Sequence, residues 1–386
     1  MTTATGTAVP RAEARDPFVD FVRAFSLLVV VAWHWVFTIL VWKDDGPHAT
    51  NPIGFTDGLF YATWLLQVMP LFFFVGGYAH QQAWLRARAK GSTIGQFVAR
   101  RSRQLLVPAL AVLGVWVAIG VASVSVFDLQ WMGQTVKLIL SPLWFLAVYL
   151  LLILLLPVSL RLHRRFDILV MVWAFGLAAV VDIVRFKNDD SAIGWLNMIL
   201  VWGLCHQLGF FYRRLVDAPR RVAWAMAWAG LFAVAMLVFT GFYPGSMVGV
   251  PGERFSNMAP PTLCIAALVF FQAGLAVLVR PWVLVRLEAG GGWTSFNELI
   301  NRFAMPLYLL HTTGMALARG LWHWIRGGQE RREPDLVWWL FRPLAFLGAL
   351  LCTLPVIWLF GRRWVKGEPN ARETGGEPVS PTPSTR

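Results

Sequence analysis

The first long apolar segment, Arg15 to Phe37, carries three residues that could do chemistry: Asp20, Arg23 and His34. Histidine has the side chain whose ordinary pKa lies nearest to neutral pH, so it can accept or donate a proton. Arginine can bind a carboxylate or phosphate group through two hydrogen bonds at once. A helix has about 3.6 residues per turn and rises about 1.5 Å per residue, so Arg23 and His34 share one face, roughly 16 Å apart. Asp20 also lies near this face, which therefore carries a line of polar side chains.

Each of these residues also has a purely structural interpretation. Asp20 and Arg23 are three residues apart, so they could form a local ion pair that anchors the entrance of a helix. His34 could be a neutral imidazole that is hydrogen-bonded to a neighbouring helix. Ionisable residues inside a membrane span are costly, however, and this cost favours a functional site that faces other helices or water.

The composition predicts an integral membrane protein. Hydrophobic residues make up 57% of the 386 residues and charged residues only 14%, with 21 Trp and 28 Phe; soluble domains have about 25% charged residues. In such a protein the net charge of +13 reports topology and not nucleic-acid binding. The three cysteines lie in apolar runs without ligand spacing, so neither a disulfide framework nor a metal site is expected.

Apolar runs long enough to cross a bilayer, which takes about 20 helical residues, predict an all-α polytopic bundle of about ten transmembrane helices. No alternating pattern typical of a β-barrel is present. The predicted spans are 18–42, 59–80, 104–127, 138–160, 167–186, 193–212, 222–242, 260–279, 303–325 and 336–360.

The distribution of Lys and Arg predicts that both termini are cytoplasmic, because basic loops remain on that side. The most basic loop is 85–108, which could act as a retention signal, contact anionic lipid or bind phosphate. The last outer loop is also rich in arginine, so either it lines an anionic acceptor site or one late span is misplaced. Its arginines are Arg319, Arg326, Arg331, Arg332 and Arg342.

The predicted domain organisation is simple. Residues 1–17 form a cytoplasmic N-terminal segment and residues 18–362 form one transmembrane domain. Residues 363–386 are rich in Pro, Gly, Ser and Thr, which predicts a disordered cytoplasmic tail.

Five ordered motifs resemble the acyltransferase 3 family of membrane-bound acyltransferases. The spacing of Arg23 and His34 resembles the Arg-x10-His motif in the first helix of that family. The remaining matches are MPLFFFVGGYAH (69–80), the basic segment Arg100-Arg101-Ser102-Arg103 before Pro108, SPLWFLAVYLLLILLLP (141–157) and FAMPLYLLHT (303–312). Two details depart from the family pattern: Gly76 replaces the usual serine, and Pro108 lies further from Arg103 than is usual.

The resemblance implies transfer of an acyl group, most often acetyl, from acyl-CoA to a hydroxyl of a carbohydrate, a lipid-linked glycan or a small natural product. It also implies a bacterial cytoplasmic (inner) membrane location. The candidate catalytic residues are then His34 and Arg23. His34 is the candidate general base, because the attacking hydroxyl must lose a proton; a covalent acyl-histidine intermediate remains an alternative. No metal is expected.

The donor is made in the cytoplasm and carries several phosphates, so arginines should bind it. Arg23, Arg100, Arg101 and Arg103 are the candidates, and the pantetheine arm would extend from Arg23 to His34. Asp20 is expected to orient Arg23.

Three further residues are weaker candidates for substrate binding. His311 follows the family pattern and could bind the acceptor, orient a helix or simply be packed. Tyr308 could be a structural hydrogen-bond donor, and Trp144 could line the acyl channel or pack in the core.

Other functions fit the composition as well. A secondary transporter or a flippase of a lipid-linked glycan is the main alternative, although no pair of interrupted helices indicates it. A membrane-bound O-acyltransferase of the other, unrelated family and a non-catalytic interaction protein are further alternatives. The N-terminal position of His34, its partner Arg23 and the ordered motifs disfavour both.

Overall fold

The structure is a computed structural model that describes residues 15–188, 191–325 and 334–365. Nearly all of the predicted N-terminal segment 1–17 and of the predicted tail 363–386 lies outside these residues, as do Arg326, Arg331 and Arg332 of the arginine-rich loop. The cytoplasmic N-terminal segment and the disordered tail therefore stay predictions.

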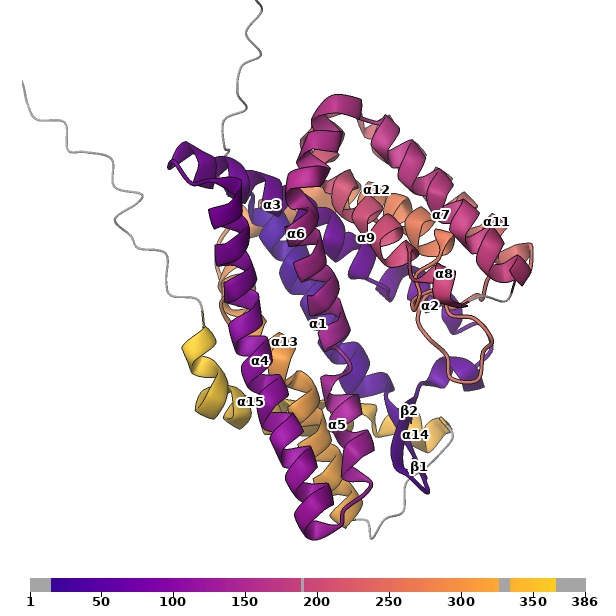
Figure 1. The fold of residues 1–386 in the computed structure, drawn as a ribbon, viewed down its shortest axis with the longest axis vertical. Helices are drawn as coiled ribbons and strands as arrows, with labels where there is room; N and C mark the ends of the chain where they lie inside the picture. The colour runs from indigo at the N-terminus through magenta and orange to yellow at the C-terminus, as the bar shows by residue number, and fades with distance from the viewer. Residues whose placement is uncertain (1–14, 189–190, 326–333, 366–386) are drawn as a thin grey trace, which may run out of the picture.

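The described residues form an α-helical bundle with one short hairpin, which confirms the predicted all-α class (Figure 1). The longer helices are α1 (Pro17–Phe37), α3 (Met69–Ala89), α4 (Ile94–Phe127), α6 (Leu143–Phe166), α7 (Leu169–Asn188), α9 (Asn197–Leu208), α11 (Arg220–Phe239), α12 (Leu263–Glu288), α13 (Gly292–Ile325) and α15 (Arg342–Val356). The shorter ones are α2 (Phe60–Leu66), α5 (Met132–Leu140), α8 (Ser191–Gly194), α10 (Tyr212–Asp217) and α14 (Leu336–Leu340).

Nine of the described helices are long and apolar enough to cross a membrane. The predicted span 303–325 lies in α13, which is not among the nine although it is 34 residues long. Buried polar side chains lower the hydropathy of α13, and they include Asn301, His311, Thr312 and Thr313. This helix therefore presents a polar face to the interior of the bundle.

The first span is shorter than predicted. α1 ends at Phe37, and residues 39–50 form an antiparallel hairpin of β1 (Ile39–Lys43) and β2 (Gly46–Thr50) instead of continuing the helix to residue 42. Gly46 closes the turn with φ 124°, a conformation that is accessible to glycine without steric cost. The hairpin pairs Ile39 with Thr50 and so brings residues 49–51 back beside the end of α1.

The predicted span 138–160 lies within Met132–Phe166, one of the nine segments that can cross a membrane, but its helix is interrupted near the start. α5 ends at Leu140 and α6 begins at Leu143, because Pro142 lacks an amide hydrogen and interrupts the helical hydrogen bonds. Two side chains of α13 satisfy the carbonyl groups at the break: Thr312 Oγ1 donates to Ile139 O at 2.9 Å, and Tyr308 OH donates to Pro142 O at 2.6 Å. Carbonyl groups in a membrane need such partners.

Helix α1 is central in the bundle. It packs against α3 and α12, whose neighbours α7, α9 and α11 occupy the upper right of Figure 1, and against α13 and α15 in the lower part. Helices α3 and α9 cross at close range. A Cβ atom at Gly77 of α3 would overlap the carbonyl oxygen of His206 of α9, so the two backbones are in direct contact.

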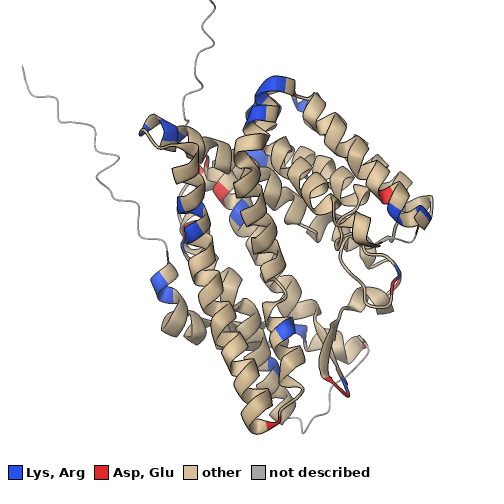
Figure 2. Cartoon of the chain, in the orientation of Figure 1, with Lys and Arg blue, Asp and Glu red and all other residues tan. Residues whose placement is uncertain are grey.

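Basic residues gather at one end of this bundle. Figure 2 shows them on the upper part of α4 and at the connection between α6 and α7, with fewer near the hairpin at the opposite end. The cytoplasmic location of both termini stays a prediction from this distribution of charge.

Candidate active site

A single large cavity of about 1530 Å³ passes between α1, α3, α4, α6 and α13. Ligand pockets usually measure about 300–1,000 Å³, so this one has room for more than one substrate. Its basic end is lined by Arg15, Arg23, Arg86, Arg100, Arg101, Arg103 and Arg363, and its hairpin end by Thr38, Ala49, Thr50, Asn51, Val248, Gly249 and Pro251.

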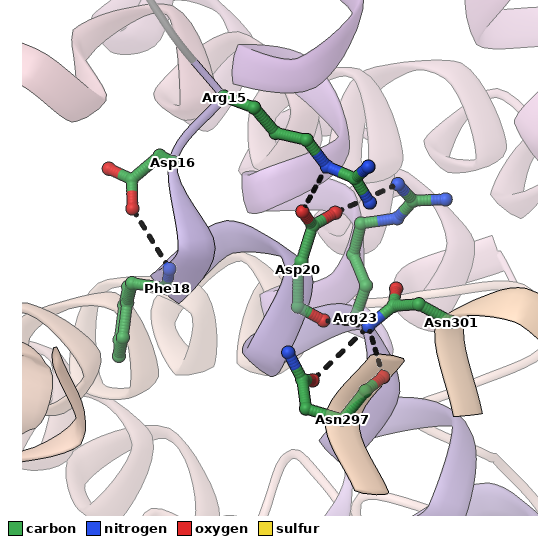
Figure 3. A network of polar contacts seen from close by, with 7 residues as sticks. All are labelled: Arg15, Asp16, Phe18, Asp20, Arg23, Asn297 and Asn301. Carbon is green, nitrogen blue, oxygen red and sulfur yellow. Dashed lines mark hydrogen bonds and ion pairs between the residues drawn. The ribbon is translucent and has the colours of Figure 1, made fainter. Parts of the chain in front are cut away.

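The basic end is organised around Asp20. Its carboxylate hydrogen-bonds Arg15 and lies 3.8 Å from Arg23 Nη1 (Figure 3). The hydrogen bond with Asp20 raises the pKa of Arg15 above its ordinary value, so the guanidinium group of Arg15 stays charged. Asn301 Nδ2 of α13 donates to the backbone oxygen of Asp20 at 3.0 Å. The predicted role of Asp20, orienting Arg23, fits this geometry.

The three arginines predicted from the basic segment of α4 all line the cavity. Arg100 and Arg103 are exposed, whereas Arg101 is half-buried, with its guanidinium 5.7 Å from the ring centre of Phe97 and a 3.3 Å hydrogen bond to Gln104. Arg86 and Arg363 also line this end but were not singled out from the sequence. Arg86 lies in the basic loop 85–108, so the charge of that loop was the available signal.

His34 lines the cavity between the two ends, and His311 lies behind it. The Nδ1 atom of His34 is 3.0 Å from Nε2 of His311, and Nδ1 of His311 is 2.7 Å from the carbonyl oxygen of Tyr308. His311 is fully buried and does not line the cavity. The structure thus places His311 against His34. A residue that contacts a substrate directly would have to lie at the cavity wall, and His311 does not.

Trp144 and Tyr308 both line the cavity. Their rings also pack in the protein: that of Trp144 lies 6.0 Å from that of Trp202, and that of Tyr308 lies 5.5 Å from that of Phe145. With its hydroxyl bonded to Pro142, Tyr308 therefore has a structural function whether or not it contacts a substrate.

A second histidine pair lies in the same region and was not expected. His80 lines the cavity, and its Nδ1 is 3.0 Å from Nε2 of the buried His206. The signal in the sequence was the position of His80 at the end of the motif 69–80.

Two arginines of the predicted outer loop hold the end of α1. Arg319 Nη2 of α13 donates to Thr38 O at 3.0 Å, and Arg342 Nη1 of α15 donates to Val36 O at 3.3 Å. Cations at the carbonyl end of a helix are favourable because they complement its dipole. These contacts fix α1 just beyond His34 and account for two of the arginines that the sequence left unexplained.

No group of three or more potential metal-ligating side chains occurs in the part of the chain that the structure describes.

The fold and the cavity define a multi-pass membrane protein with an internal polar site. Residues 16–362 match a family described as an acyltransferase domain, and this match covers nearly the whole chain. The chain therefore belongs to the acyltransferase 3 family and is a membrane acyltransferase, with an acyl donor and a hydroxyl acceptor as its substrates. No curated protein and no solved structure matches it significantly.

Proposed function

We propose that the protein transfers an acyl group, acetyl in the simplest case, from acyl-CoA to a hydroxyl of a carbohydrate, a glycolipid or a small natural product. In this proposal His34 is the general base. The observation that carries it is the single cavity that joins an arginine cluster to a histidine. The bacterial cytoplasmic membrane is the proposed location.

The donor would bind with its phosphates at the basic end. Guanidinium groups form paired hydrogen bonds with phosphate, and the arginines of α1, α3 and α4 converge there. Arg23 and His34 are roughly 16 Å apart along one helix face. An extended pantetheine arm that starts near Arg23 would bring the thioester toward His34.

The acceptor would approach from the hairpin end. The side chains that line this end are uncharged, and they include Thr38, Thr50 and Asn51, with Trp33 and Phe37 of α1 nearby in the chain. Hydroxyl and amide groups beside aromatic rings suit a neutral, hydroxyl-rich compound. The proposed acceptor is therefore uncharged in the part that enters the cavity.

In the proposed reaction His34 removes the proton of the acceptor hydroxyl as its oxygen attacks the thioester carbonyl carbon. The carbon–sulfur bond then breaks, and His34 returns the proton to the CoA sulfur. The products are the acyl ester and CoA, so atoms and charge balance.

Acetyl-CoA is expected to stabilise the purified full-length protein, because a ligand that binds only the folded state adds RT ln(1 + [L]/Kd), about 2.7 kcal/mol at 100 times Kd. Replacing Arg101 by glutamine should weaken binding by about 10- to 100-fold, the usual effect of losing a charged hydrogen bond. Thermal unfolding in detergent over a range of acetyl-CoA concentrations measures both. Arg161→Gln, an exposed arginine outside the cavity, is the matched control. No stabilisation of the wild type at millimolar acetyl-CoA would refute the donor site.

The basic end is expected to face the cytoplasm. Lys90 follows α3 near this end and Lys43 lies in the hairpin, and both are exposed. In intact cells a membrane-impermeant maleimide should label a Lys43→Cys variant and not a Lys90→Cys variant, with Cys352 replaced by alanine because it is only half-buried. The reverse labelling would invert the proposed topology.

A further inference from the structure

We propose that His311 is a positioning residue that fixes the tautomer of His34, so that Nε2 of His34 is the unprotonated nitrogen offered to the cavity. The inference rests on the role of His34 proposed above. It follows from a directed chain of three groups: the Tyr308 carbonyl, the His311 ring and the His34 ring.

The direction of the chain is set at its inner end. A carbonyl oxygen only accepts hydrogen bonds, so Nδ1 of His311, 2.7 Å from Tyr308 O, must carry a proton. In a neutral ring the other nitrogen then has a lone pair and accepts. Nδ1 of His34, 3.0 Å from Nε2 of His311, must therefore be the donor. This leaves Nε2 of His34 without a proton.

The neutral state of His311 follows from its surroundings. Its side chain is fully buried, and its polar contacts within the described residues are with His34 and the backbone carbonyls of Tyr308 and Leu307, none of which carries a negative charge. Burying an unpaired charge is very costly. His34, in contrast, lines the cavity, so its Nε2 can reach a substrate.

The backbone around His311 is held firmly, as positioning requires. Trp35 Nε1 of α1 donates to the carbonyl oxygen of His311 at 3.0 Å. Together with the contact between His34 and the His311 ring, this makes two hydrogen bonds between α1 and α13 at His311. The next residue, Thr312, bonds to α5. Gly314 lies against Thr353 of α15, with no space for a Cβ atom. His311 is thus fixed from three helices.

The arrangement also serves the reaction step. When His34 takes the acceptor proton on Nε2, its ring becomes positively charged and its Nδ1–H bond to His311 becomes a charge-assisted hydrogen bond, which is stronger than a neutral one. His311 gains no proton in this step. Its lone pair stabilises the charged ring until the proton passes to the CoA sulfur.

The tautomer can be measured without any substrate. In the full-length protein with ¹⁵N-labelled histidine, solid-state NMR should show His34 protonated at Nδ1, with its signal among the seven histidines assigned by its loss in His34→Asn. His311→Leu should lose this preference. His311→Gln should keep it, because the amide oxygen can accept from Nδ1–H. A wild-type His34 protonated at Nε2 would overturn the proposal.

Turnover gives the second readout, with acetyl-CoA as the donor, glucose as a neutral, hydroxyl-rich acceptor and the released CoA thiol as the signal. His311→Leu should lower kcat by about 100-fold or more, as expected for a base in the wrong tautomer, with less than about a threefold change in KM for acetyl-CoA. His311→Gln should recover at least about tenfold of the loss. His206→Gln is the matched control, because it makes the same change in a pair of equal length that does not include His34.

The two proposals fail in different ways. If His34→Ala releases CoA as fast as the wild type but wild-type His34 shows the expected tautomer, general-base catalysis by His34 fails while the positioning by His311 stands. If turnover depends on His34 but His311→Leu and His311→Gln lose activity equally, and the Nδ1–H signal is the same in both, His311 acts only in packing.

Discussion

Replacing His34 by alanine is expected to lower the turnover of acetyl-CoA by about 10²- to 10⁴-fold, the usual contribution of a general base. The reason is local: the proposed base, His34, lines the cavity between its basic end and its hairpin end. Nothing at the basic end changes in the variant. Stabilisation by acetyl-CoA should therefore stay within a few-fold of the wild type, which separates a loss of chemistry from a loss of binding.

The same assay contains its control. His48→Ala removes a half-buried histidine of the hairpin that pairs with Asp45 and does not line the cavity, so its turnover should stay close to that of the wild type. A His34→Ala protein that keeps more than a tenth of the wild-type rate, with unchanged acetyl-CoA stabilisation, would rule out His34 as the base.

Gly77→Ala is expected to destabilise the fold, whereas Gly76→Ala is not. A Cβ atom at Gly77 would overlap His206 O and lie 3.3 Å from Gly209 Cα, and a backbone cannot move aside as a flexible side chain can. Overpacking of this kind costs about 1–3 kcal/mol and occasionally more. At Gly76 the nearest atom is Tyr149 Cε2 at 3.4 Å, an ordinary contact. Removing a glycine there should even gain about 0.5–1 kcal/mol.

The measurement is the thermal unfolding of both variants in the same detergent. Adjacent residues of one helix share their membrane environment, so a difference between them reports the crossing of α3 and α9 alone. Equal unfolding temperatures for the two variants would mean that the crossing relaxes at no cost. Gly76→Ser adds a further comparison, because serine is the usual family residue at this position.

The apolar runs predicted most of the helices because length and hydropathy alone decide whether a segment crosses a membrane. They could not predict the end of α1 at Phe37, since Ile39–Lys43 is apolar enough to continue a helix and only pairing with β2 shows otherwise. They also missed the break at Pro142, which is stabilised by Tyr308 and Thr312 from a distant helix. Contacts of this range leave no mark on local composition.

The periodicity of the sequence predicted only those parts of the candidate site that lie on a single helix. Helical periodicity placed Asp20, Arg23 and His34 on one face, and all three line the cavity. Periodicity says nothing of which helix lies opposite, so the contact between His34 and His311, 277 residues apart, could not be foreseen. The capping of α1 by Arg319 and Arg342 was hidden in the same way.

The two ends of the cavity are built from different parts of the chain. The arginines come from α1, α3, α4 and the segment after α15, whereas the other end comes from the β1–β2 hairpin and residues 248–251. The hairpin and residues 248–251 lie far in sequence from the arginines of α3 and α4. In the proposed binding mode, exchanging residues 39–51 and 248–251 would therefore change the acceptor preference while the arginines and the histidine pair stay unchanged.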